Sequence, residues 1–133
     1  MNLEDLLKKT VEVDGSDLHI TVGTPPRVRK GGSLLSMGDQ KLMSDVVKSL
    51  IESKMSKEQI DRFNNGQEID YSIGIPGLSR FRVNVFKQRG NIAAAYRRLP
   101  FDAPELEKLG LPASVIDLSE KRKGLVLITG ATG

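Results

Sequence analysis

Ser79-Arg-Phe-Arg-Val-Asn-Val-Phe-Lys87 and Asn91-Ile-Ala-Ala-Ala-Tyr-Arg-Arg98 are alternating segments that predict the two strands of a β-hairpin. Arg89-Gly90 lies between them as the turn. If the loop has an even number of residues centred on this pair, Arg82 faces Arg97 across the hairpin. A loop one residue longer or shorter would change that pairing, whereas the alternation within the first strand would remain.

The alternation divides this hairpin into an apolar face and a polar face. The apolar face is expected to anchor the hairpin on the core, and it carries Phe81, Val83, Val85, Ala94 and Tyr96. The polar face carries Arg80, Arg82, Asn84, Ala93, Ala95 and Arg97. Three arginines therefore share one side of the ribbon, beside alanines whose small side chains leave room for a ligand or another chain.

The charge of this region is one-sided. Between Tyr71 and Pro100 there is no Asp or Glu, although the whole chain holds 17 of them. Opposed like charges on a sheet are unfavourable by a few tenths to about 1 kcal/mol. A bound anion would relieve them, and phosphate suits arginine because the guanidinium group donates two parallel hydrogen bonds. The alternative is that the arginines are solvated or pair with acidic residues of the helices.

The segments around the hairpin predict more strands and two well-marked helices. Asn2 caps an N-terminal helix, and Asp39 is expected to cap a longer helix whose apolar residues run to Ile51. Ser56 and Gln59 form a capping box for the next helix. Further strands are expected over 17–22, 27–30, 33–36 and 68–73. The fold class is therefore α+β, an antiparallel sheet packed with helices, with a boundary near residue 100.

Composition excludes several kinds of site. Hydrophobic residues make up 38% of the 133 residues and charged residues 28%, which is typical of a globular protein. The chain has no cysteine, so disulfides and Cys-type zinc sites are excluded. His19 is the only histidine and is expected to be structural, with no metal site. Asp17, Glu68 and Asp70 begin strands, where turn or cap hydrogen bonds are expected.

The sequence also bears on two kinds of partner that a basic chain can have, nucleic acids and membranes. Aromatic residues are only 5% of the chain, so the usual platform for stacking bases is missing and no nucleic acid is expected. The Met1-Asn-Leu-Glu-Asp5 start is not a signal segment. No stretch approaches membrane-spanning length, so any membrane connection is expected to run through a partner.

The last ten residues carry a second phosphate-binding signal. Gly124-Leu-Val-Leu-Ile-Thr129 predicts a short buried strand that runs into Gly130, Ala131, Thr132 and Gly133. These four residues match the first half of the G-x-x-x-x-G-K-[ST] loop, whose lysine is absent. A strand followed by a Gly-rich turn is common in itself. The interpretation as a phosphate loop depends on its agreement with the arginine hairpin, and the chain holds no complete catalytic site.

The sequence resembles the PilT-like type IV pilus retraction ATPases of the secretion and pilus motor superfamily. The resemblance covers essentially the whole chain and rests on five motifs in one order and spacing. These are Gly15-Ser-Asp-Leu-His-Ile20, Pro25-Pro-Arg-Val-Arg29, Pro76-Gly-Leu-Ser-Arg-Phe-Arg-Val-Asn-Val-Phe86, Tyr96-Arg-Arg-Leu-Pro100 and Gly124-Leu-Val-Leu-Ile-Thr-Gly130. The start close to the first helix favours a retraction motor over a pilus-assembly or type II secretion ATPase, which stays the alternative.

The resemblance implies three parts: a PAS-like N-terminal domain over 1–100, a linker with short helices over 101–123, and the start of a RecA-like ATPase domain over 124–133. It implies a homo-hexamer, cytoplasmic and peripheral to the bacterial inner membrane, with an inner-membrane pilus platform protein as partner. Arg80, Arg82 and Arg97 match the arginines that approach ATP, which binds with Mg²⁺ in the full-length parent. Arg98 competes with Arg97 for that role.

Two further expectations concern activity. Because the lysine of the phosphate loop is missing, this chain alone should not hydrolyse ATP. A different class of function, a non-enzymatic module that docks on a protein through the same basic face, stays open.

Overall fold

The computed structural model describes residues 2–100 and 105–130. The chain divides into two compact units, residues 1–101 and 102–133. Within the described residues, no helix has the length and hydrophobicity needed to cross a membrane.

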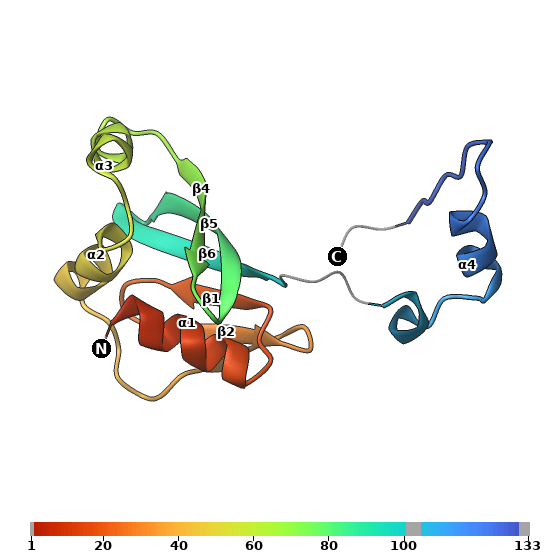
Figure 1. The fold of residues 1–133 in the computed structure, drawn as a ribbon. Coiled ribbons are helices and arrows are strands. Elements are labelled where there is room, and N and C mark those ends of the chain that lie inside the picture. Colours follow the sequence, from red (N-terminus) through yellow and green to blue (C-terminus); the bar gives the residue numbers. More distant parts are fainter. Residues whose placement is uncertain (1, 101–104, 131–133) are drawn as a thin grey trace. The chain divides into compact units, whose positions relative to one another are not determined.

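The first unit is a six-stranded sheet with three helices (Figure 1). Its strands are β1 (Asp17–Ile20), β2 (Arg27–Lys30), β3 (Ser33–Ser36), β4 (Ile69–Ile75), β5 (Ser79–Gln88) and β6 (Asn91–Leu99). They lie in the order β3-β2-β1-β6-β5-β4, and every neighbouring pair is antiparallel. The helices are α1 (Leu3–Glu12), α2 (Ser44–Glu52) and α3 (Lys57–Asn64). The predicted antiparallel sheet with helices is confirmed.

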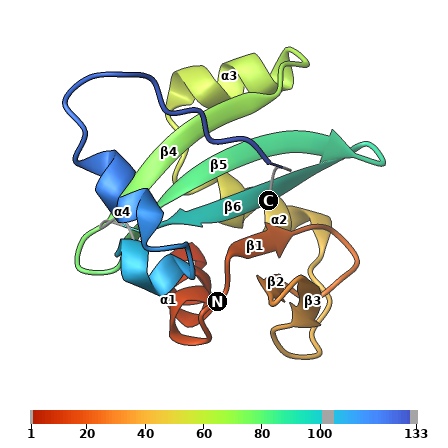
Figure 2. The same cartoon turned by 90° about the vertical axis from the view of Figure 1, so that its right-hand side faces the viewer.

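The core lies between these helices and one face of the sheet. Leu7 of α1, Ile51 of α2 and Phe63 of α3 are buried with Val83 of β5 and Tyr96 of β6. The sheet residues in this core are those that the alternation assigned to the apolar face of the hairpin. Figure 2 faces the sheet with α2 behind its strands. The other face of the sheet is left without a helix from this unit, and we call it the open face.

The central hairpin has the predicted turn and register. Arg89 and Gly90 both have positive φ, 51° and 80°, as a two-residue type I′ turn requires. Arg82 is directly opposite Arg97, and the pairing continues through Asn84 and Ala95. The even-numbered loop is therefore confirmed, and with it the side of the sheet on which each hairpin residue stands.

Two predicted helix starts are confirmed and one is wrong. The Asn2 side chain accepts a hydrogen bond from the Asp5 backbone, and the Ser56–Gln59 capping box is present. The second helix does not start at Asp39 but at Ser44. Residue 42 is held outside the helix because its backbone bonds to the loop after β1. The Leu42 N–H donates to the carbonyl of residue 24 at 3.0 Å, and its own carbonyl accepts from residue 23 at 2.8 Å.

The second unit contains a short 3₁₀ helix, η1 (Leu106–Leu109), and the helix α4 (Ser114–Ser119). The strand predicted over 124–129 is not formed, since residues 125–130 have no strand assignment. Leu125, Leu127 and Ile128 are 82%, 77% and 89% exposed. A single strand cannot satisfy its backbone hydrogen bonds alone, and the parallel neighbours that would pair with it are not among the described residues.

Candidate functional site

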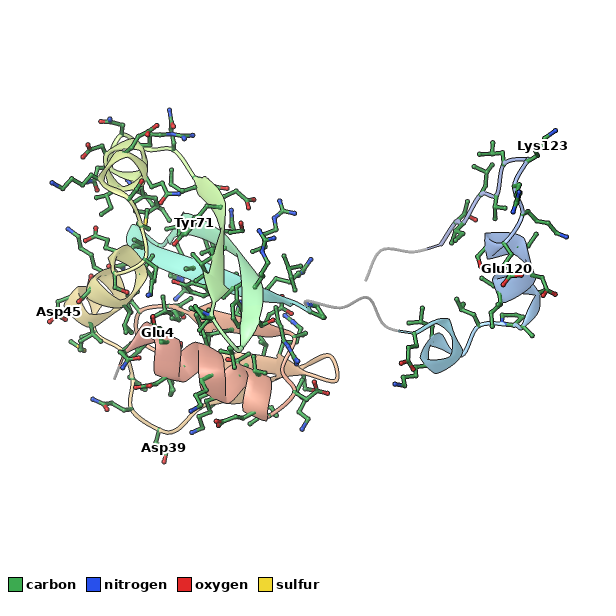
Figure 3. All side chains as sticks on the ribbon, viewed as in Figure 1. Glu4, Asp39, Asp45, Tyr71, Glu120 and Lys123 are labelled. Atoms are coloured by element: carbon green, nitrogen blue, oxygen red, sulfur yellow. The ribbon has the colours of Figure 1, made fainter. Side chains whose placement is uncertain are left out.

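The open face of the sheet carries the predicted arginines. Arg80 and Arg82 are exposed on β5, and Arg97 is exposed directly opposite Arg82 on β6. Tyr71 of β4, labelled in Figure 3, belongs to the other side, where it packs against the core. Arg98 also turns away from the open face, because it follows Arg97 in an alternating strand. Of the two adjacent arginines, the geometry places only Arg97 beside Arg82.

Two of the three arginines hold carboxylates from neighbouring strands. Arg82 donates from Nε and from one terminal nitrogen to the two carboxylate oxygens of Asp70 on β4, each at 3.0 Å. Arg97 donates from Nε to Asp17 Oδ1 on β1 at 3.1 Å. Both arginines remain largely exposed, at 65% and 70% of their side-chain area. Each therefore keeps unused N–H donors directed away from its carboxylate.

These pairs correct two expectations. The acidic partners come from strands and not from helices, and Asp17 and Asp70 bind arginines beyond any turn or cap role. The cause is the order of the strands: Asp17 lies directly opposite Arg97 in the β1–β6 pair. Asp70 lies opposite Asn84, one pair along from Arg82 on the same face. Alternation within one strand does not show that Asp17 and Asp70 lie beside these arginines. That also requires knowing which strands are neighbours in the sheet.

Asp17 is the most enclosed charge of this face, with 11% of its side chain exposed. Burial disfavours its charged form, but hydrogen bonds from Ser16 and Arg97 outweigh that effect, and the pKa of Asp17 is lowered below its ordinary value. The Arg29 guanidinium on β2 adds a second ion pair at 3.7 Å. At Asp70 the hydrogen bonds of Arg82 likewise lower the carboxyl pKa. Both carboxylates are therefore charged at neutral pH.

Arg80 differs from the other two arginines. Its described polar contact is with the Ser72 hydroxyl at 3.5 Å, the outer limit for a hydrogen bond. Within the part of the chain that the structure describes, it forms no ion pair with a carboxylate. It lines a hollow together with Ser72, Arg82, Leu99 and Asp70, whose carboxylate is already held by Arg82. Arg80 is thus the arginine of this face that is best placed to receive an external anion.

The arrangement suits a phosphate-bearing ligand. Arg82, Arg97, Asp17 and Asp70 line a second hollow beside the first, together with Asn84 of β5 and Ala95 of β6. Four arginines of this face, Arg29, Arg80, Arg82 and Arg97, stand against two carboxylates, those of Asp17 and Asp70. The spare N–H groups of Arg82 and Arg97 and the whole guanidinium of Arg80 can donate to phosphate oxygens. For a metal ion, no group of three or more acidic or histidine side chains converges within residues 2–100 and 105–130.

The remaining predicted residues are less informative. Gly130 lies at the end of the described residues, and Ala131, Thr132 and Gly133 of the predicted phosphate loop lie outside them. His19 is half-buried on β1, and its Nε2 atom has no hydrogen-bond partner. Burial lowers the His19 pKa, although the Asp17 charge opposes that shift. His19 is therefore neutral at pH 7.

Comparison with known proteins gives the chain a family context. No protein-family model matches it. It is 35% identical over 133 residues to the type IV pilus retraction ATPase PilT of Pseudomonas aeruginosa, which is the whole of this chain and 39% of that protein. The crystal structure of the pilus retraction motor PilT with bound ADP matches the whole chain with a TM-score of 0.82 and 38% identity. The chain is a homologue of PilT.

Other relatives agree with this PilT-like assignment. The type IV pilus ATPase PilU of Pseudomonas aeruginosa is also 35% identical over 133 residues. The match covers the whole of this chain and 35% of PilU. The ATPase DotB of Legionella pneumophila has a TM-score of 0.82 at 27% identity over 98% of this chain. The chain spans less than two fifths of the length of PilU and 39% of PilT. The matching PilT structure contains bound ADP.

Proposed function

We propose that this chain is the N-terminal, nucleotide-sensing domain of a hexameric ATPase that powers type IV pilus retraction. The relatives named PilT and PilU support the assignment to a pilus motor. The observation that carries the nucleotide role is the open face, where Arg80 has no carboxylate partner among the described residues and stands beside Arg82 and Arg97. In this proposal the three arginines approach ATP that a RecA-like domain holds.

The arginines would act by neutralising the charge of the triphosphate. Arg80 donates directly to phosphate oxygens, whereas Arg82 and Arg97 are already oriented by Asp70 and Asp17. Because a paired arginine loses less conformational freedom on binding, the two carboxylates would act as positioning groups. The described residues contain no group of three or more acidic or histidine side chains that could hold Mg²⁺. We therefore assign Mg²⁺ to the RecA-like domain together with the ATP.

The same proposal assigns the parts of the chain. Residues 1–100 form a PAS-like domain, which the single antiparallel sheet with helices on one face supports. Residues 101–123 form the linker, and 124–133 begin the RecA-like domain, where the exposed Leu125 and Leu127 would enter a parallel sheet. The assembled motor would work at the cytoplasmic side of the inner membrane, against a pilus platform protein.

An ATPase for pilus assembly or type II secretion is the alternative within the superfamily. The fold alone does not single out PilT, because the ATPase DotB matches with the same TM-score of 0.82. The higher identity with PilT, 38% against 27%, favours the retraction motor. Loss of pilus retraction with pili still assembled, after deletion of the gene, is the result that the retraction motor predicts.

ATP turnover by the full-length protein tests the arginine role. Arg80→Gln should lower kcat by at least about tenfold, because one charge-assisted contact to the transferred phosphate is removed. Arg98→Gln is the matched control: Arg98 is a neighbouring arginine that pairs with Asp14 and faces away from the open side. Unchanged turnover in single Arg80, Arg82 and Arg97 variants would refute the role. Partner capture that depends on these arginines but not on nucleotide would favour a docking module instead.

A further inference from the structure

A separate hollow lies at the far end of the open face, next to the turn of the central hairpin. It has a volume of about 420 Å³, within the range of small-molecule sites. Strands β1, β2, β3, β5 and β6 all contribute to it, together with the loop after β1. Its lining residues are His19, Thr21, Val22, Thr24, Arg27, Leu34, Phe86, Gln88, Arg89, Asn91, Ile92 and Ala93.

The small side chain of Ala93 leaves space at the bottom of this hollow. Ala93 is four residues before Arg97 on β6, so both stand on the open face. A longer side chain there would fill the space between Phe86, which lies directly opposite on β5, and the residues of β1. Ala93 itself is only 1% exposed, because larger neighbouring side chains cover it. The hairpin thus builds a depression at this end as a consequence of its sequence.

The charge of the hollow is purely positive. Arg27 of β2 and Arg89 of the hairpin turn both line it, and no Asp or Glu is among the residues that line it. Neither arginine forms an ion pair with a carboxylate within the described parts of the chain. Asp17, the nearest carboxylate on β1, is already held by Arg97 and Arg29. An anion in the hollow would meet two guanidinium groups with no internal competitor.

The rest of the lining suits a planar ring with polar edges. Phe86 is half-buried on the open face and offers a ring surface, and Leu34 across from it is 44% exposed. The amide groups of Gln88 and Asn91 can each donate and accept hydrogen bonds at the edge of such a ring. A ligand of this kind has an aromatic body and an anionic end.

We infer that this hollow binds a nucleoside monophosphate, with its base on Phe86 and its phosphate between Arg27 and Arg89. The site is distinct from the two hollows that Arg80, Arg82 and Arg97 line on the same face. It is separated from them along β6 by Ala95, which lines the hollow of the arginine pairs and not this one. A ligand here would report on the nucleotide pool without occupying the position proposed for ATP.

An NMR titration of the 133-residue chain with AMP tests the inference. We expect shift changes centred on Phe86, Asn91 and Ala93. The double variant Arg27→Gln/Arg89→Asn should weaken AMP binding by about tenfold or more, since two charge-assisted contacts are lost. Asn at position 89 preserves the turn, because Asn-Gly is the preferred type I′ sequence. Both arginines are exposed, so the double variant is expected to fold.

The control variant is Arg98→Gln, which should bind AMP as the wild type does, because Arg98 pairs with Asp14 and faces away from the open face. Adenosine, which lacks the phosphate, and inorganic phosphate, which lacks the ring, should each bind at least about tenfold more weakly than AMP. The inference is overturned if AMP shifts no residue of the hollow, or only residues around Arg80 and Arg97. Wild-type affinity in the double variant, or equal affinity for adenosine, would overturn it as well. Failure of the ATP turnover test leaves this result unaffected, because the two sites use different arginines.

Discussion

Asp17 is the residue that ties the open face together. It accepts from Ser16 at 2.8 Å and from Arg97 at 3.1 Å, and it also meets Arg29 of β2. One carboxylate therefore links β1 to the strands on both of its sides. Because the Asp17 side chain is only 11% exposed, its loss removes the shared partner of Ser16, Arg29 and Arg97, which costs more than the loss of one fully exposed ion pair.

Asp17→Asn should destabilise the protein by about 1–3 kcal/mol at pH 7. The folded-state pKa of Asp17 lies below the ordinary value of 3.8, so its contribution is present above that value and is lost as pH falls through the folded pKa. Wild type should therefore lose more stability than Asp17→Asn on acidification to about pH 3. Urea unfolding of both proteins at the two pH values measures this. An equal difference in unfolding free energy at both would contradict it.

Part of the site could be predicted from residues alone. Alternation along one strand was sufficient to place Arg80 and Arg82 together, and the turn at Arg89 brought Arg97 opposite. The carboxylates could not be assigned, because Asp17 reaches Arg97 only when β1 lies beside β6, 80 positions along the chain. Pairings of distant strands depend on the whole sheet, and no local pattern specifies them.

The connection between α1 and β1 requires a glycine at position 15, because no side chain fits there. A Cβ atom at Gly15 would lie far inside the contact distance of the Val28 side chain and 3.0 Å from the Thr10 carbonyl. The Gly15 N–H donates to that same carbonyl at 2.8 Å, which holds the backbone in place. The approach of the helix to the sheet is therefore set by the absence of a Cβ at this position.

Gly15→Ala should lower the free energy of unfolding by about 1–3 kcal/mol, because the new methyl group overpacks the junction. Gly74→Ala is the matched control, since a Cβ on this β4 glycine meets nothing within 4 Å. The control should stay within about 0.5 kcal/mol of wild type. Urea denaturation curves with unchanged slopes measure both. Equal stability of the two variants would show that the junction yields to the extra methyl group.

Elements were predicted well where their own residues determine them. The Asn2 cap and the capping box at Ser56 lie within one helix turn of the bonds they make, so the sequence is enough to locate them. The N-cap of α2 was predicted four residues early, at Asp39 and not at Met43, because Leu42 bonds to a loop that is distant in sequence. The expected strand over 124–129 is not formed, since residues 125–130 have no strand assignment.

At the scale of the whole molecule, the sheet separates two tasks. Its helix-covered face holds the core, with Phe81, Val83 and Tyr96 completely buried. Its open face holds charges in a row from Arg80 at one end of the hairpin to Arg89 at the other. Substitutions on the open face therefore change binding without removing core contacts. This separation is what makes the arginine variants informative about function.

The most direct measurement is a crystal structure of the full-length protein with ATP or a non-hydrolysable analogue. Our account predicts that the Arg80 guanidinium lies at hydrogen-bond distance, about 3 Å, from a phosphate oxygen. It also predicts that Arg82 or Arg97 reaches the same nucleotide. A structure in which the bound triphosphate contacts none of the three, while Arg82 and Arg97 stay on Asp70 and Asp17 and Arg80 remains in solvent, would contradict it.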